Sequence, residues 1–192
     1  MKRVVRYPDL RLRKAAPVMT KEEVRAVGDG LVSGDIAHDT VQLLATKGDG
    51  VALAANQAGS ELRYFAIDRQ RADSDDEGKQ IPTVVCNPIV VGASLEMIEG
   101  DEGCLSFPGI FFKVSRHAWV DVDFMYSSDN YVEVMGRQVV NVKSMRLTGF
   151  WARVFQHEIE HLDGKTFVDN KPQKTRMQIA NELRIRMQKQ GW

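Results

Sequence analysis

The sequence H-E-I-E-H at residues 157–161, followed by L-D-G at residues 162–164, gives the strongest indication of the fold. Residues four apart on an α-helix lie one above the other, so His157 and His161 can present two imidazole nitrogens to one metal ion. Glu158 follows the first histidine at the edge of the same face, where it can act on a water at the metal rather than bind the metal itself. The pattern predicts a helix that carries a metal site and a general base.

An apolar stripe on the same predicted helix supports this interpretation. Phe150 and Val154 precede His157 and His161 at helical spacing, which predicts that the histidine pair continues a core-facing stripe. Buried histidines need partners for both ring nitrogens, and a metal on one nitrogen with a carbonyl or carboxylate on the other provides them. Gly164 predicts the end of the helix. Because a five-residue match also arises by chance, two surface histidines are the alternative.

Composition predicts one globular domain over residues 1–192, because 43% of the residues are hydrophobic and no tract is of low complexity. Lys plus Arg and Asp plus Glu balance at 26 each, which argues against DNA or a membrane surface as a partner. No stretch approaches the roughly 18 apolar residues of a membrane span, so we expect a cytoplasmic protein. Two cysteines, Cys86 and Cys104, are too few for a disulfide framework.

Periodicity and turn residues predict an α+β fold, with antiparallel strands packed against the metal-binding helix and a last helix closing the chain. Thr20 and Glu23 fit a capping box that begins an early helix, and Cys86 is expected to be a small core residue. The predicted strands are 63–68, 82–91, 118–124, 131–134 and 138–142, a charged loop is predicted at 69–80, turns at 127–130 and Gly136, and further helices through 40–45 and from Thr175 to Lys189.

Catalytic metal sites commonly use three protein ligands and keep one position open, and two residues are candidates for the third ligand. Glu182 lies downstream of His161 at a distance that resembles the third ligand of thermolysin-like zinc peptidases. Cys104 lies upstream in a loop bounded by Gly and Pro, where a thiolate beside a metal is chemically reasonable. A third possibility is a non-catalytic metal-stabilised protein, which would not need Glu158.

The run of small residues from 50 to 59 carries one pair of side-chain amides, Asn56 and Gln57. Small side chains let a backbone approach its neighbours closely, so tight packing of a strand or helix is one interpretation. The other is a wall facing a substrate, with Gln57 as a neutral hydrogen-bond donor.

Three separated stretches resemble the three motifs of the peptide deformylase family, bacterial type. They are G-V-A-L-A-A-N-Q at 50–57, E-G-C-L-S at 102–106 and Q-H-E-I-E-H-L at 156–162. The second matches at every position, whereas Ala52 replaces a usual Gly in the first and Glu160 replaces a commoner Asp in the third. The opening R-Y-P-D at 6–9 is also similar, so the resemblance extends over nearly the whole chain.

The resemblance implies antiparallel sheets around a central helix carrying HExxH, with a C-terminal helix. It implies that Cys104, His157 and His161 hold the metal, which is Fe2+ in the cell, with Ni2+, Co2+ or Zn2+ as substitutes. Glu158 would be the general base and then the acid, and Gln57 would form an oxyanion hole with the amide of Leu105.

The family's substrate is the N-formyl-methionyl end of nascent polypeptides, from which formate is released. The resemblance implies that the substrate-binding residues are Gly50, Val51, Gly103, Phe150 and Val154. Arg153 stands where an apolar pocket residue is more usual, so the resemblance leaves the depth of the pocket open.

The segment 171–192 has six basic residues and one acid, a net charge of +5 in a chain whose net charge is zero. Met177, Ile179, Ala180, Leu183 and Met187 can form an apolar stripe that docks this helix and turns its basic face outward. A solvated face is one interpretation. The other follows from the resemblance, because some bacterial deformylases carry a C-terminal helix that contacts the ribosome.

Overall fold

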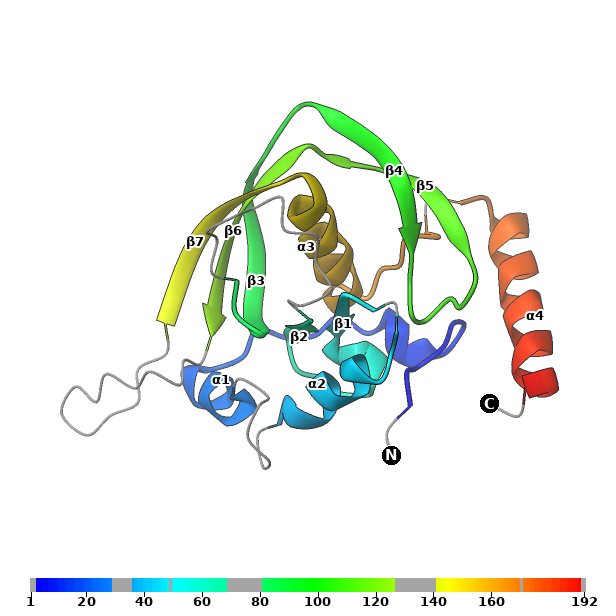
Figure 1. Ribbon diagram of the computed structural model, residues 1–192, viewed down its shortest axis with the longest axis horizontal. Coiled ribbons are helices and arrows are strands. Elements are labelled where there is room, and N and C mark those ends of the chain that lie inside the picture. The colour runs from blue at the N-terminus through cyan, green and yellow to red at the C-terminus, as the bar shows by residue number, and fades with distance from the viewer. Residues whose placement is uncertain are drawn as a thin grey trace.

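The fold contains two antiparallel sheets (Figure 1). The structure is a computed structural model that describes residues 3–28, 36–48, 50–68, 81–126, 141–169 and 171–190. The larger sheet has the strand order β1-β2-β3-β6-β7, and the smaller one is the hairpin β4-β5. The strands are β1 Ala52–Ala54, β2 Tyr64–Ile67, β3 Val84–Ala93, β4 Met97–Gly103, β5 Phe111–His117, β6 Trp119–Tyr126 and β7 Asn141–Thr148.

Three predicted strands, 63–68, 82–91 and 118–124, are confirmed as β2, β3 and β6. Cys86 in β3 is fully buried, as expected for a small core residue. The predicted loop 69–80, the strand 131–134 and the turns at 127–130 and Gly136 lie outside the described residues. Of the predicted strand 138–142, only its last two residues are described, and they begin β7, which continues to Thr148.

The β4-β5 hairpin was not predicted, although its two strands pair over seven consecutive residues from Met97↔His117 to Gly103↔Phe111. β4 reads M-I-E-G-D-E-G and has one buried residue, so it lacks the apolar alternation on which the strand prediction depended. Backbone pairing with β5 forms this strand, and such a pairing cannot be read from β4 alone.

The helices are η1 Leu10–Arg13, α1 Lys21–Val27, α2 His38–Ala45, η2 Ala55–Ala58, α3 Gly149–Leu162 and α4 Gln173–Gln190. The predicted capping box is confirmed. The Thr20 hydroxyl accepts from the Glu23 amide at 3.2 Å, and the Glu23 carboxylate accepts from the Thr20 amide at 2.7 Å. These bonds satisfy two amides that the first turn of α1 would otherwise leave without partners.

One face of α3 packs into the core, between the larger sheet and the β4-β5 hairpin (Figure 1). The ring of Phe155 lies edge-on to Phe65, with centroids 5.0 Å apart, and 6.0 Å from Phe124. Burying a Phe side chain contributes roughly 1.5–3 kcal/mol, so this contact fixes the helix on the sheet. The predicted core-facing stripe is wrong at Phe150, which is 39% exposed because the opposite face of α3 meets a cavity.

α3 ends where Gly164 predicted. Gly164 has φ +71°, and its amide donates to the His161 carbonyl at 3.0 Å, while the Lys165 amide donates to the Glu160 carbonyl at 2.8 Å. A Cβ at residue 164 would lie 2.6 Å from the Arg13 carbonyl oxygen, so both the backbone angle and the space require glycine.

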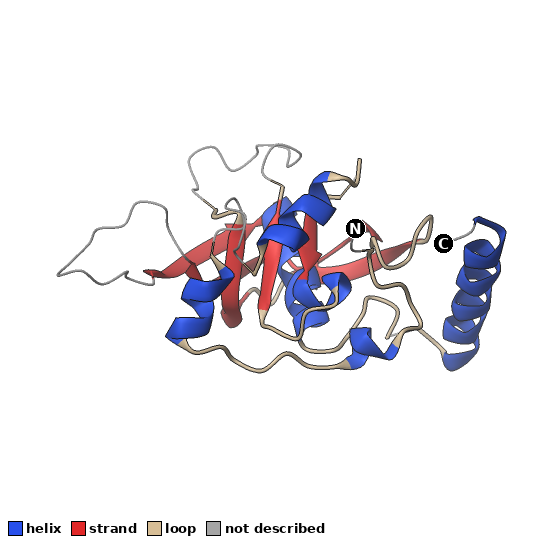
Figure 2. Ribbon diagram, turned by 90° about the horizontal axis from the view of Figure 1, so that it is seen from below, coloured by secondary structure: helices blue, strands red, loops and turns tan. Residues whose placement is uncertain are grey.

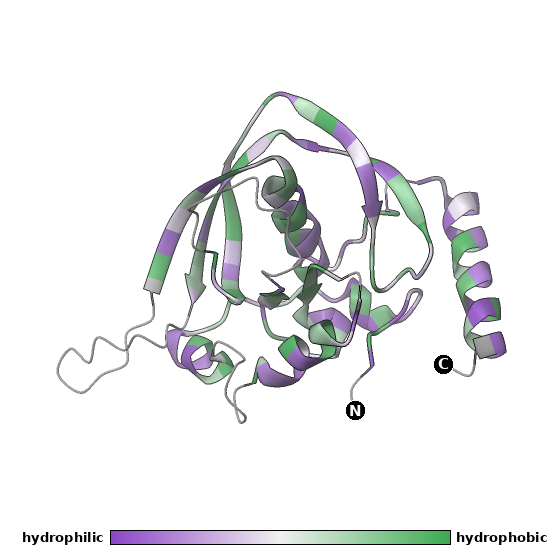
Figure 3. Ribbon diagram, in the orientation of Figure 1, coloured by the Kyte–Doolittle hydropathy of each residue, from purple (hydrophilic) through white to green (hydrophobic). Residues whose placement is uncertain are grey.

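α4 stands at one end of the molecule, beside the β4-β5 hairpin (Figures 1 and 2). Ile179 and Leu183, one turn apart, are buried in a cluster with Phe107 and Phe167, so the predicted apolar stripe is confirmed there. It is wrong at Met177, which is 64% exposed because it lies two residues before Ile179 and faces the other way. Hydrophobic and hydrophilic patches accordingly alternate along α4 (Figure 3). No described helix has the length and apolar character that crossing a bilayer requires.

Candidate active site

Cys104, His157 and His161 converge on one point. Cys104 is the first residue after β4, and the histidines lie one turn apart on α3. Their ligand atoms all lie within 4.8 Å of one another, and the Cys104 Sγ is 3.2 Å from the His161 Nε2. One thiolate and two imidazoles are the number and kind of ligands that catalytic transition-metal sites use. The residues therefore fit a metal ion.

The two histidines differ in how readily they hold a proton. Burial lowers the pKa of His161 well below its usual value, so its ring is neutral, the form that binds metals. Burial also opposes the charged form of His157, but the hydrogen bonds that its ring donates to Cys104 and Glu102 outweigh burial and raise its pKa. Metal binding needs neutral imidazole rings, so an ion would displace a proton held by His157.

Glu102 is the residue that orients the first histidine. Its Oε2 lies 3.0 Å from the His157 Nδ1, so the Nε2 of that ring is left for a metal. Arg116 holds both carboxylate oxygens, at 2.8 and 2.9 Å, and Arg153 contacts Oε1 at 2.7 Å. Burial alone would raise the pKa of Glu102, but hydrogen bonds from Arg116 and His157 prevail and keep it well below its usual range.

Arg153 and Glu160, two residues that depart from the family pattern, both belong to this hydrogen-bond network. Arg153 also donates to the carbonyl oxygens of Val114 at 2.9 Å and Ile98 at 2.8 Å, so its head group binds the β4-β5 hairpin. Glu160 accepts from Arg116 at 2.7 Å, which the longer side chain makes possible. Sequence reasoning quoted Glu102 in a motif and missed its role, because Arg116 lies fourteen residues away on the opposite strand.

Glu158 is buried beside the ligand group and lines the cavity. Among the residues that the structure describes, its Oε2 has no hydrogen-bond partner. Burial raises the pKa of Glu158 to about 7, although the nearby His157 acts in the opposite direction. A carboxyl group with this pKa can both accept and deliver a proton near neutral pH.

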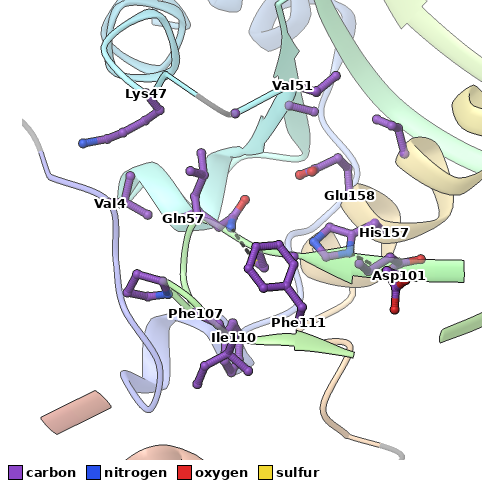
Figure 4. A pocket seen from close by; sticks show the side chains of 18 of the residues that line it. Val4, Lys47, Val51, Gln57, Asp101, Phe107, Ile110, Phe111, His157 and Glu158 are labelled. Atoms are coloured by element: carbon purple, nitrogen blue, oxygen red, sulfur yellow. Dashed lines mark hydrogen bonds and ion pairs between the residues drawn. The ribbon is translucent and has the colours of Figure 1, made fainter. Parts of the chain in front are cut away.

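Gln57 is held rigidly on η2, opposite α3 (Figure 4). Its Oε1 accepts from the Ala54 amide at 2.9 Å, which turns Nε2 toward the Cys104 Sγ at 3.3 Å and the Ser106 Oγ at 3.0 Å. The small residues around it are packed in the core, which confirms tight packing of the run 50–59, whereas its role as a wall facing a substrate stays a prediction. The run packs tightly, and Gln57 faces the ligand group.

A cavity of about 580 Å³ opens beside the ligand group. The predicted general base and substrate-binding residues all line it, together with the candidate oxyanion-hole residues: Gly50, Val51, Gln57, Gly103, Leu105, Phe150, Val154 and Glu158. At Gly50 a Cβ would lie 2.9 Å from the Leu105 Cδ1, so glycine lets the two walls approach. The structure brings the predicted residues together, and their individual roles remain predictions.

Glu182 does not join the histidines. It lies on α4, where it forms an ion pair with Arg186, and within the described ranges the group that can hold a metal contains Cys104 instead. The thermolysin-like arrangement is therefore not favoured.

The fold and the site together define a class of protein, a small α+β domain built around a Cys-His-His group that fits a metal ion. Comparison with known proteins identifies the family: the family model described as polypeptide deformylase matches residues 1–177. The chain belongs to the peptide deformylase family, whose members are metalloenzymes.

Named relatives agree. The chain is 39% identical over 130 residues to peptide deformylase 2 of Nostoc sp., a match that covers 66% of each sequence. It is 30% identical over 190 residues to the peptide deformylase of Endomicrobium trichonymphae, covering 99% of this chain and 98% of that one.

Solved structures share the fold over the whole chain. A peptide deformylase from Legionella pneumophila has a TM-score of 0.74 at 28% identity, covering 100% of this chain and 98% of that one. A peptide deformylase from Ehrlichia chaffeensis in complex with actinonin has a TM-score of 0.71 at 23% identity, covering 97% of each chain.

Proposed function

We propose that this enzyme removes the N-formyl group from the N-terminal formyl-methionine of nascent polypeptides and releases formate. The observation that carries the proposal is the convergence of Cys104, His157 and His161 beside a buried Glu158 whose pKa is near 7. Family membership supports the same reaction. We infer that residues 1–192 act as one catalytic domain, in the cytoplasm, where nascent chains arise.

Cys104, His157 and His161 would hold the metal, Fe2+ in the cell, with Ni2+, Co2+ or Zn2+ able to replace it. When bound, such an ion supplies Lewis acidity, which lowers the pKa of water toward ~7 and polarises a carbonyl group. Glu102 supports this role, because its bond to the His157 Nδ1 fixes the tautomer that leaves Nε2 for the ion.

Glu158 then moves the protons. Its carboxylate accepts a proton from the attacking water as the new C–O bond forms at the formyl carbon. The same carboxyl group delivers that proton to the leaving nitrogen as the C–N bond breaks, so that formate and a free amine result. The Gln57 Nε2 and the Leu105 amide donate to the formyl oxygen while it carries negative charge. Phe150 and Val154 line the cavity that would receive the methionine side chain.

The experiment that tests the function compares formyl-Met-Ala-Ser with acetyl-Met-Ala-Ser. We expect formate from the first peptide and no deacylation of the second. An acetyl group carries one methyl group more than a formyl group, and that methyl group would have to fit beside Gln57 and Glu158. Cleavage of an internal peptide bond would instead support a peptidase.

Replacing Gln57 by Ala is expected to lower kcat by roughly 10²–10³, because each oxyanion-hole donor acts mainly in the transition state. KM should change little. Steady-state kinetics on formyl-Met-Ala-Ser measure both constants, and Ser106→Ala is the control, because it removes a neighbour of Gln57 without removing the donor. An effect on KM alone would assign Gln57 to peptide positioning.

We propose that the basic segment 171–192 contacts the ribosome. The structure indicates which substitutions can test this contact. Removing α4 would uncover Phe107, because Ile179 and Leu183 are buried against it. Reversing the charges of the exposed Lys174, Arg184 and Lys189 to Glu avoids this problem. We expect reduced ribosome co-sedimentation at low salt with unchanged hydrolysis of a short peptide, since phosphate contacts weaken steeply when cations are lost. Unchanged co-sedimentation would overturn the ribosome proposal.

A further inference from the structure

The loop that follows the cysteine ligand ends in a tight turn at residues 107–110. The Ile110 amide donates to the Phe107 carbonyl at 3.1 Å, and Gly109 has φ +71°. Proline at the second position and a positive φ at the third define a type II turn. Pro108 and Gly109 both line the cavity.

The central peptide of this turn has a fixed direction. In a trans peptide the carbonyl and the N–H point opposite ways, and a type I turn would have this peptide flipped. The Arg186 Nη1 donates to the Pro108 carbonyl at 3.0 Å. Arg186 therefore stabilises the orientation that Pro108 and Gly109 favour, in which the Pro108 carbonyl faces α4.

Arg186 is itself held in place from two sides. Glu182 pairs with its Nη2, and Leu183, fully buried one turn earlier, anchors α4 in the cluster that contains Phe107 and Ile110, the two ends of the turn. The guanidinium lies so near the turn that a Cβ on Gly109 would be 2.7 Å from Nη1.

The Gly109 amide must point away from α4, because the Pro108 carbonyl points toward it. All four residues of the turn line the cavity and no described residue of α4 does, so the cavity lies on a side of the turn that α4 does not cover. In the described part of the chain the Gly109 amide has no hydrogen-bond partner. Gly109 is exposed whereas Glu158 is buried, so this amide lies nearer the mouth than the reacting end.

We propose that the Gly109 N–H binds a backbone carbonyl of the peptide where it leaves the cavity, and that Arg186 is the positioning residue that aims it. The inference rests on the proposed peptide substrate. It assigns to α4 a part in substrate binding.

Kinetics on peptides of two lengths test the positioning. For Arg186→Leu we expect the KM for formyl-Met-Ala-Ser to rise about three- to tenfold, with kcat unchanged. This rise corresponds to the loss of one hydrogen bond to the peptide. KM for N-formyl-methioninamide should not move, because that substrate ends before the mouth. Arg186→Lys should restore much of the effect, since one N–H suffices for the Pro108 carbonyl. Arg184→Leu, on the exposed face of the same helix, is the matched control.

A spectroscopic measurement separates substrate binding from a merely structural role. We expect the Gly109 amide proton of zinc-loaded protein to shift downfield when the product Met-Ala-Ser is added, and this shift to be lost in Arg186→Leu. An unchanged Gly109 resonance, or equal KM values for the variant and the parent, would overturn the inference. Absence of formate from every formyl peptide would instead count against the proposed function, since product binding is measured without turnover.

Discussion

Replacing Glu158 by Gln is expected to lower kcat by roughly 10²–10⁴ while the metal stays bound. An amide can neither take a proton from water nor give one to the leaving nitrogen, and proton transfer by a positioned side chain contributes about this much. Cys104, His157 and His161 are untouched by the change, so metal content should equal that of the parent.

Stability offers a second readout for the same variant. Glu158 is buried, and its Oε2 has no partner among the described residues, so its ionised form is costly in the folded state. The neutral amide should leave the melting temperature unchanged or raise it, because residues kept for activity often lower the stability of the folded protein. Glu160→Gln is the matched control, because it alters a partly exposed glutamate of α3 that pairs with Arg116. Comparable turnover in Glu158→Gln and the parent would remove Glu158 from the mechanism.

Replacing Glu102 by Gln is expected to be the most destabilising single change near the site. It leaves the buried guanidinium of Arg116 with Glu160 as its remaining carboxylate partner, and breaking a buried ion pair on one side costs up to about 3–5 kcal/mol. His157 loses the charged acceptor of its Nδ1 proton, so metal affinity should fall roughly 10–100-fold. Denaturant unfolding of the metal-free protein measures the first effect, and metal titration measures the second.

Asp121→Asn is the matched control for this prediction. Asp121 forms the same two-bond pair with Arg146, at 2.7 Å for each bond, but on the exposed face of β6 and β7. Exposed pairs contribute little, so this variant should unfold almost like the parent. Equal losses in the two variants would show that geometry, rather than burial, determines the contribution of Glu102.

The histidine pair could be predicted from sequence because its spacing is local. His157 and His161 are four apart on one helix, and the capping box at Thr20 and the stop at Gly164 likewise depend on neighbours in the chain. The choice between Cys104 and Glu182 could not be made from the residues alone, because it depends on how distant elements fold together. The structure favours Cys104 by placing it 3.2 Å from His161.

The features that the sequence did not predict depend on contacts between residues far apart in the chain. The β4-β5 hairpin is formed by pairing rather than by a burial pattern, and it brings Glu102 to Arg116. The contact of Arg186 with the Pro108 carbonyl joins residues 78 apart in the sequence. A hydrophobic pattern within a short stretch of sequence cannot reveal contacts between residues so far apart. The predicted apolar stripe is wrong at Met177, because a residue two positions before Ile179 lies on nearly the opposite side of a helix with 3.6 residues per turn.

Metal content after anaerobic purification of Cys104→Ser and Glu182→Gln tests the account most directly. The Cys-His-His site predicts about one metal ion per chain in the parent and in Glu182→Gln, and loss of most of the metal in Cys104→Ser, since a hydroxyl is a much weaker ligand than a thiolate. Full metal content in Cys104→Ser, with loss in Glu182→Gln, would contradict it.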